Sequence, residues 1–397
     1  MGLNDISSGE RLHIVFLGMR NAGKSSIVNA VTGQNLSVVS DVKGTTTDPV
    51  KKSMELLPLG PVVIVDTAGL DDEGELGRLR VQKSVQMLAR ADIAVLVVDA
   101  VKGLGNEDSA LIETLKAKKL PYVVVYNKAD LLDSDSRREL AANELYVSAA
   151  NGENIKELKD MLGVLAKDRK NTKYIVSDLL NPGDVVVLVT PIDEAAPKGR
   201  LILPQQLTIR DILDAHAVVV TCQDTEYAET LKSLSVKPKL VITDSQVFGR
   251  VSVETPADVM LTSFSILMAR YKGELKILTD GAMALSNLKE GDKVLISEGC
   301  THHRQCNDIG TVKLPAWIEK FCSAKPEFHF TSGGDFPDNL SDYDVIVHCG
   351  GCMLNEVEMK HRIEKASAAG VPIVNYGIAI AHMNGILEKS IEPFKEK

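Results

Sequence analysis

Apolar runs separated by amphipathic segments fill residues 11–165 of the chain. The runs lie at 12–18, 62–69, 93–100, 122–130 and 144–150, and several of them end in a polar motif. Between them, segment 107–119 carries apolar residues three or four positions apart, which is the period of an amphipathic helix. Strands that are apolar on both faces and alternate with helices are typical of a parallel sheet covered on both sides.

The same alternation occurs twice more along the chain. One set of apolar runs lies at 184–193, 217–223 and 239–246, and another at 292–299, 342–348 and 371–377. We therefore predict the α/β fold class, with three consecutive α/β domains. The first is a P-loop GTPase fold over 1–170, and two smaller parallel-sheet units follow over 176–262 and 265–397. The middle unit has no phosphate loop and no cluster of catalytic side-chain types, which favours an interaction or oligomerisation role.

A phosphate-binding loop follows the first apolar run. Gly18–Ser25 reads GMRNAGKS and matches G-x-x-x-x-G-K-S/T between a predicted strand and a predicted helix. The glycines let the backbone curl so that its N–H groups face phosphate oxygens at the helix N-terminus. We expect Lys24 to reach the β- and γ-phosphates and Ser25 to ligate Mg²⁺.

Four further motifs follow, and together with the loop they indicate a GTPase domain. GTTTD supplies Thr46 for Mg²⁺, and DTAG supplies Asp66 for the magnesium shell and the Gly69 N–H for the γ-phosphate. NKAD supplies Asp130, whose carboxylate accepts from guanine N1–H and N2–H, and SAA closes over the base. The expected nucleotide contacts are Gly18, Asn21, Ala22, Gly23, Lys24, Ser25, Ser26, Thr46, Asp66, Gly69, Asn127, Lys128, Asp130, Ser148 and Ala149.

Charge and composition narrow the range of partners. The chain has 45 basic and 54 acidic residues among 397, a net charge of −9. An acidic chain without a basic stripe argues against a nucleic-acid partner. No apolar stretch reaches the ~18 residues of a membrane span, and the N-terminus has no secretory pattern. We therefore expect a cytoplasmic protein without a membrane partner.

Two pairs of soft metal ligands end two predicted strands of the third unit. Cys300 and His302 form C-x-H after one strand, and Cys349 and Cys352 form C-x-x-C after another, with 46 residues (303–348) between the pairs. Parallel strands end at one sheet edge, so the pairs are expected to meet there. Three thiolates and a histidine suit zinc, and three thiolates with a replaceable fourth ligand suit a [4Fe–4S] cluster. Spacing does not separate the two metals; Cys306 is a spectator or alternative ligand, and His348 a candidate hydrogen-bond donor.

The first unit resembles the GTPases that include MnmE, Era and Der, through GMRNAGKS, GTTTD and DTAGL. The resemblance implies that Asn21 helps to hold a potassium ion, which stabilises charge at the phosphates. The expected catalytic residues are Asn21, Lys24 and Thr46. The residue after DTAG is Leu70, where a water-orienting glutamine stands in Ras-like enzymes. We therefore expect slow, potassium-stimulated hydrolysis of GTP.

The whole chain resembles the HydF family of [FeFe]-hydrogenase maturation GTPases, chiefly through CTH and HCGGC. The resemblance implies a [4Fe–4S] cluster on Cys300, Cys349 and Cys352, with His302, Glu298, Asp308, Cys306 or an exogenous group as the fourth ligand. It also implies that the middle domain dimerises the chain, with a tetramer as an alternative. The implied function is to carry the diiron precursor of the H-cluster from the radical-SAM proteins HydE and HydG to apo-hydrogenase HydA.

An RNA-directed GTPase with a structural zinc site is the alternative reading. Such a protein would act in ribosome assembly or tRNA modification, and the first unit fits it equally well. The net acidity and the cysteine arrangement argue against it. A dithiol redox sensor built on C-x-x-C would leave Cys300 and His302 unexplained.

Overall fold

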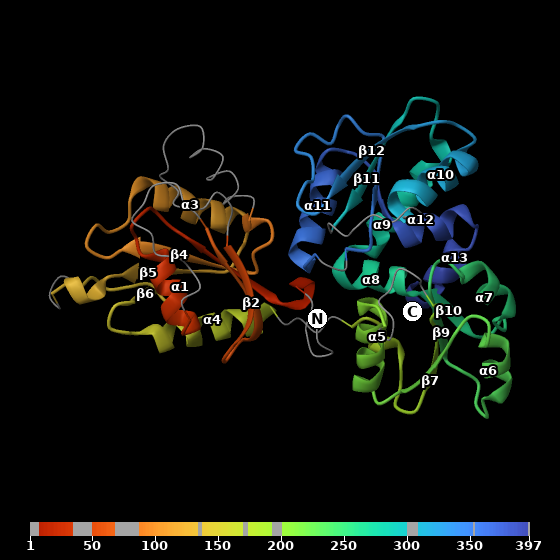
Figure 1. Cartoon of the computed structure of the whole chain (residues 1–397), viewed down its shortest axis with the longest axis horizontal. Helices are drawn as coiled ribbons and strands as arrows, with labels where there is room; N and C mark the ends of the chain where they lie inside the picture. Colours follow the sequence, from red (N-terminus) through yellow and green to blue (C-terminus); the bar gives the residue numbers. More distant parts are fainter. Residues whose placement is uncertain are drawn as a thin grey trace. The chain divides into compact units, whose positions relative to one another are not determined.

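The computed structural model describes residues 8–34, 50–67, 87–133, 137–169, 174–192, 201–299, 309–351 and 354–395. The chain forms two compact units, Met1–Thr172 and Lys173–Lys397 (Figure 1). Helices and mostly parallel sheets make up both units, which confirms the predicted α/β class. Among the described residues, none of the helices combines the length and the apolar character that crossing a bilayer requires.

The first unit is built on a six-stranded sheet of order β2-β3-β1-β4-β5-β6. Its strands are β1 (Leu12–Leu17), β2 (Val50–Leu56), β3 (Gly60–Asp66), β4 (Ile93–Asp99), β5 (Tyr122–Asn127) and β6 (Glu144–Tyr146). Its helices are α1 (Lys24–Thr32), α3 (Asn106–Ala117) and α4 (Ile155–Arg169), with short 3-10 turns η1 (Ser8–Glu10) and η2 (Ala129–Leu131). Strand β2 runs antiparallel to β3, because only a short turn joins them and a parallel crossover needs many more residues.

Alternating side chains of the central strands form two cores, one on each face of this sheet. Ile14 and Phe16 of β1 pack with α1 and α4 on one face. Val15 and Leu17 pack with α3 on the other face. The period of two along a strand explains why the buried part of β1, residues 14–17, is apolar at every position, and the polar phosphate-loop motif follows the strand's end.

The second unit contains two four-stranded parallel sheets. In the first, of order β10-β9-β7-β8, the strands are β7 (Val185–Val189), β8 (Val218–Cys222), β9 (Leu240–Thr243) and β10 (Met260–Ser263). Helices α5 (Leu203–Asp214), α6 (Tyr227–Ser233) and α7 (Phe248–Glu254) and the turn η4 (Ser177–Leu179) accompany it. Val186 and Leu188 face one core and Val187 and Val189 the other, so both faces of β7 are buried.

The second sheet of this unit has the order β12-β11-β13-β14. Its strands are β11 (Lys293–Glu298), β12 (Glu327–Ser332), β13 (Val345–His348) and β14 (Ile373–Asn375). The accompanying helices are α8 (Phe264–Lys272), α9 (Leu275–Ala282), α10 (Leu314–Cys322), α11 (Glu356–Ala368), α12 (Tyr376–Met383) and α13 (Leu387–Ile391). Three short turns complete it: η5 (Met283–Asn287), η6 (Ile309–Lys313) and η7 (Glu392–Phe394).

Helix α8 belongs to the cores of both sheets of the second unit. Phe264 and Leu267 pack in the core of the β7 sheet. Ile266 and Ala269 pack in the core of the β11 sheet. Because one helix is shared, the two sheets form one compact unit, and its division at 176–262 and 265–397 stays a proposal.

Candidate nucleotide site and candidate metal centre

The loop between β1 and α1 takes backbone conformations that favour glycine. Gly18 and Gly23 have φ of 146° and 88°, and Asn21 has φ of 62°. A Cβ on Gly18 would lie 2.1 Å from the carbonyl oxygen of Val97 in β4. The loop therefore passes so close to the neighbouring strand that no larger residue fits at position 18.

Lys24 and Ser25 begin α1 and point their polar atoms at groups around the loop. Lys24 is buried, and its Nζ donates to the carbonyl oxygens of Gly18 at 2.9 Å and Met19 at 3.0 Å. The Ser25 hydroxyl donates to Asp66 Oδ2 at 2.8 Å. Within the described part of the chain, the buried Asp66 Oδ1 accepts no hydrogen bond. A hydroxyl and an unsatisfied carboxylate oxygen are hard oxygen ligands, so these residues fit the Mg²⁺ that a GTPase requires.

The Asn127 side chain connects the phosphate loop to the predicted base-binding loop. Its Nδ2 donates to the Ala22 carbonyl at 2.9 Å, and its Oδ1 accepts from the Ala149 N–H at 3.1 Å. A Cβ on Gly23 would lie 2.2 Å from this Nδ2, so glycine is also what allows the amide to reach the loop. Asn127 is 3% exposed, and three predicted motifs thus converge on one buried amide.

Lys128 is tied to the end of β4. It has φ of 67°, and its Nζ lies 2.6 Å from Asp99 Oδ2. Partial burial acts to raise the pKa of Asp99, but the hydrogen bond from Lys128 and two backbone N–H groups outweigh it and lower that pKa. The stem of Lys128 is therefore fixed beside the strand ends.

The remaining expected nucleotide contacts occupy the same sheet edge where they are described. Ser148 is fully buried just after β6, Asp130 is exposed after β5, and Ser26 lies in the first turn of α1. Thr46, Gly69 and Leu70 lie outside the described residues. The roles of all these residues remain predictions.

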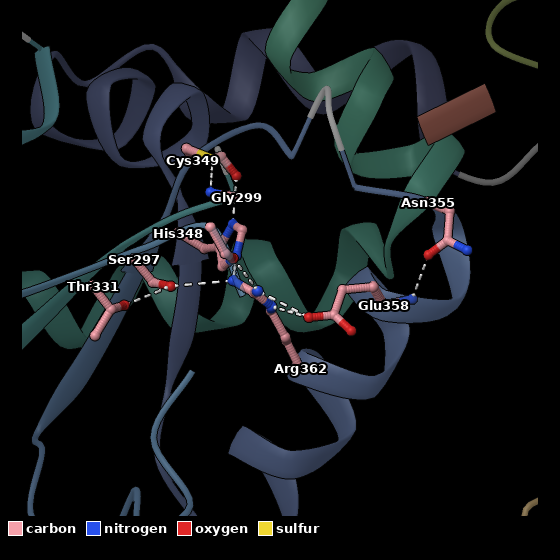
Figure 2. A network of polar contacts seen from close by, with 9 residues as sticks. Ser297, Gly299, Thr331, His348, Cys349, Asn355, Glu358 and Arg362 are labelled. Atoms are coloured by element: carbon pink, nitrogen blue, oxygen red, sulfur yellow. Dashed lines mark hydrogen bonds and ion pairs between the residues drawn. The ribbon is translucent and has the colours of Figure 1, made fainter. Parts of the chain in front are cut away.

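The second unit brings Cys349 against the end of β11. Strands β11 and β13 pair in parallel with Ser297 opposite His348, and the Cys349 N–H donates to the Ser297 carbonyl at 2.9 Å. Figure 2 shows the cysteine beside Gly299, whose N–H lies 3.0 Å from the Cys349 Sγ. The Gly351 N–H donates to the same sulfur at 3.4 Å. Gly299, which precedes Cys300 in the sequence, therefore lies beside Cys349 at one sheet edge, and the meeting of the two ligand pairs stays a prediction.

Several predicted metal ligands cannot be located. Cys300, His302, Cys306, Asp308 and Cys352 lie outside the described residues. Within the described ranges, no group of three or more His, Cys, Asp or Glu side chains could hold a metal ion. Glu298, another candidate for the fourth ligand, has its Oε1 3.5 Å from the Tyr376 hydroxyl.

Behind Cys349 lies a buried polar network that the sequence did not reveal. His348 Nδ1 lies 2.7 Å from the Cys349 carbonyl oxygen, and its Nε2 lies 3.0 Å from Arg362 Nη1. Burial, followed by the Arg362 charge, lowers the pKa of His348 to about 3. The ring is therefore neutral, with Nδ1–H donating to the carbonyl and Nε2 accepting from Arg362. His348 thus donates to the backbone of the cysteine, and its role toward a bound metal stays a prediction.

Arg362 carried no signal in the sequence. Its ion pair with Glu358 has the i, i+4 spacing that usually marks an exposed helix surface. Here the Arg362 side chain is fully buried instead.

Comparison with protein-family models assigns the three parts of the chain. Residues 175–273 match the hydrogen maturase F dimerization domain, and residues 276–393 match its tetramerization domain. The chain belongs to the hydrogen maturase F family. Residues 13–128 of this family member match the 50S ribosome-binding GTPase model, so the chain carries a GTPase domain. The matches to a dimerization and a tetramerization domain support an oligomeric protein, and they do not favour an RNA-directed GTPase.

Relatives that share the GTPase domain match only part of the maturase. GTPase Der of Kosmotoga olearia is 32% identical over 189 residues, which cover 43% of this chain and 42% of Der. The tRNA modification GTPase MnmE of Chromobacterium violaceum is 40% identical over 123 residues, which cover 31% of this chain and 27% of MnmE. The chain thus spans less than half the length of these relatives. Among solved structures, Era of Aquifex aeolicus is 18% identical with a TM-score of 0.35, covering 56% of this chain and 98% of Era.

Proposed function

We propose that this maturase is a GTP-hydrolysing scaffold that binds a [4Fe–4S] cluster and delivers the diiron precursor of the H-cluster to apo-[FeFe]-hydrogenase. One observation carries the proposal. A single chain joins a GTPase domain to hydrogen maturase F domains, and the second of these presents a cysteine sulfur with two backbone N–H groups directed at it.

The surroundings of Cys349 support the cluster. Backbone N–H donors stabilise the negative charge of a ligating thiolate and help to set the potential of an iron–sulfur cluster. Cys300 follows Gly299 directly in the sequence, and Cys352 follows Gly351. We propose Cys300, Cys349 and Cys352 as the cluster ligands, with His302, Glu298, Asp308, Cys306 or an exogenous group at the fourth iron.

An iron without a fourth thiolate suits a carrier. His348 has both ring nitrogens engaged within the protein, which leaves neither for a metal. A fourth position held by a weaker or exogenous ligand allows another complex to bind and leave. The partners would be HydE and HydG as donors of the diiron precursor and HydA as its acceptor.

The GTPase site would regulate these encounters. Lys24 would contact the β- and γ-phosphates, Ser25 with Thr46 and the Asp66 carboxylate would hold Mg²⁺, and Asn21 would help to hold K⁺. The exposed Asp130 would select guanine. Hydrolysis would be slow and potassium-stimulated, because the apolar Leu70 cannot orient water. Ordering and release of the segments around Thr46 and Gly69 would change the affinity for partners.

Activation of apo-hydrogenase tests this function. The chain would be co-expressed with HydE and HydG, purified without oxygen, and mixed with HydA made without any maturase. We expect hydrogen evolution with the wild type and less than a tenth of it with Cys349→Ser. Cys322→Ser, at the end of α10, is the control and should match the wild type. Equal activation by Cys349→Ser and the wild type would overturn the proposal.

A further inference from the structure

Arg362 is the largest fully buried side chain of the described residues, and it joins three strand ends to α11. Its guanidinium pairs with Glu358 Oε1 of the same helix at 2.9 Å. Nη1 donates to the Ser297 hydroxyl of β11 at 3.3 Å, and Nη2 donates to the Gly333 carbonyl after β12 at 2.8 Å. Nη1 also contacts His348 Nε2 at the end of β13 (Figure 2).

A buried ion pair of this kind is weak evidence for stability. Two charges lose their hydration on burial, and well-packed apolar side chains of similar volume usually serve stability as well. The side-chain exposures of Arg362 and Glu358 are 0% and 6%. What the pair adds is geometry: a planar guanidinium places its donors in fixed directions. The direction that matters here is toward His348.

His348 connects Arg362 to the backbone of Cys349 through two hydrogen bonds. Arg362 donates to Nε2, which requires the proton of the neutral ring to be on Nδ1, and the Nδ1–H then donates to the Cys349 carbonyl. The Cys349 N–H is bonded to the Ser297 carbonyl. Both backbone polar groups of the cysteine are thus held, so its Sγ stays between the N–H groups of Gly299 and Gly351.

We propose that Arg362 and His348 are positioning residues that hold the Cys349 sulfur against the Gly299 and Gly351 amides at the sheet edge. The inference rests on the proposed function only for its consequence at the cluster. Amide donors to a ligating sulfur favour the more negative, reduced state of a cluster. Loss of the alignment therefore lowers the reduction potential.

The first test uses the metal-free chain. Selective labelling with ¹⁵N-glycine reads the hydrogen exchange of the Gly299 and Gly351 amides. In His348→Gln the side-chain amide replaces both the donor and the acceptor, whereas His348→Leu supplies neither. We expect exchange at both amides to rise at least about tenfold in His348→Leu and to stay near the wild-type rate in His348→Gln. The amide of Gly273, the residue after α8, donates to the Ala269 carbonyl of that helix and is the internal control.

The double variant Glu358→Leu/Arg362→Met removes both buried charges together, so it leaves no unpaired charge to unfold the unit. It should behave like His348→Leu. Unchanged exchange at Gly299 and Gly351 in both variants would overturn the inference, and so would equal exchange in His348→Gln and His348→Leu.

The second test measures the midpoint potential and the electron paramagnetic resonance spectrum of the reconstituted cluster. We expect a lower potential and an altered spectrum in His348→Leu, both restored in His348→Gln. A wild type without labile sulfide would defeat the proposed function, while the exchange experiment would still decide the positioning role. A wild-type cluster with unchanged potential in His348→Leu would defeat the inference alone.

Discussion

At the scale of single residues, a few buried polar side chains connect motifs that lie far apart in the sequence. Asn127 bonds to the phosphate loop and to the loop after β6, and Arg362 bonds to the ends of two strands and to the loop after a third. Each is buried and has several partners, so its replacement leaves other buried groups unpaired. Such residues are expected to affect a site without contacting the reacting atoms.

The Asn127→Ala substitution tests this for the nucleotide site. Both hydrogen bonds of the side-chain amide are lost, so the Ala22 carbonyl and the Ala149 N–H lose a partner. We expect GTP affinity to fall roughly 10- to 100-fold, the equivalent of about 1.4 to 2.8 kcal/mol. Titration with a fluorescent GTP analogue measures it. Asn339→Ala, an exposed asparagine of the second unit, should bind like the wild type; an equal affinity in Asn127→Ala would contradict the bridging role.

The Asp99–Lys128 pair predicts a dependence of stability on pH. The folded-state pKa of Asp99 lies below its usual value, so its stabilising effect is complete above the unfolded pKa and is lost as pH falls through the folded one. The stability advantage of the wild type over Asp99→Asn should therefore be present at about pH 6 and shrink between about pH 5 and 3. Urea unfolding of both proteins across this range measures it. A difference that stays constant with pH would show that the ion pair is not its source.

At the scale of secondary-structure elements, the buried strands were predictable, whereas the edge strands β2 and β12 were not. The central strands β1, β4, β5, β7 and β13 are apolar on both faces, and the motifs follow strand ends as predicted. Strand β2 (VKKSMEL) and strand β12 (EFHFTS) each lie at a sheet edge and mix polar with apolar residues. Their sequences lack a continuous apolar run because one side of an edge strand faces away from the sheet.

The buried network at Cys349 could not be predicted for a related reason. The sequence shows Glu358 and Arg362 one helical turn apart, a pattern shared by buried and exposed helix faces. Only the packing of α11 against β11 and β13 decides between them. That the ends of β11 and β13 are neighbours was predictable, because parallel strands end at one edge.

We predict that the edge strand β8 lies at the interface between two protomers. It lies within the part that matches a dimerization domain, it is the last strand of its sheet, and Val218 is 47% exposed. Pairing with a strand of a second copy would provide hydrogen-bond partners for the backbone N–H and C=O groups along the outer edge of β8 and would cover Val218. In a two-fold interface each substitution appears twice, so Val218→Lys/Thr221→Lys would introduce four lysines along the paired strands.

We expect this double variant to weaken dimerisation at least about tenfold, because like charges across a strand pair repel. Sedimentation equilibrium measures the dissociation constant. Val253→Lys, on the exposed face of α7 with 85% exposure, is the matched control. If the double variant dimerises as tightly as this control, β8 does not form the dimer interface.

At the scale of the whole molecule, one chain carries a GTPase domain and the proposed metal centre on separate compact units. The GTPase domain alone fits many cellular roles, as its similarity to Der and MnmE shows. The two maturase domains and the sulfur environment of Cys349 are what distinguish this protein. The central claim is therefore about the metal. We propose that the cysteines hold an iron–sulfur cluster and that the bound nucleotide regulates binding of the partner proteins.

Metal and sulfide analysis of protein purified and reconstituted without oxygen tests that claim most directly. The account predicts about four irons and four labile sulfides per chain, the composition of one [4Fe–4S] cluster. Most of both should be lost in Cys349→Ser and kept in Cys322→Ser. One tightly held zinc with no labile sulfide would contradict the scaffold and identify a structural metal site instead.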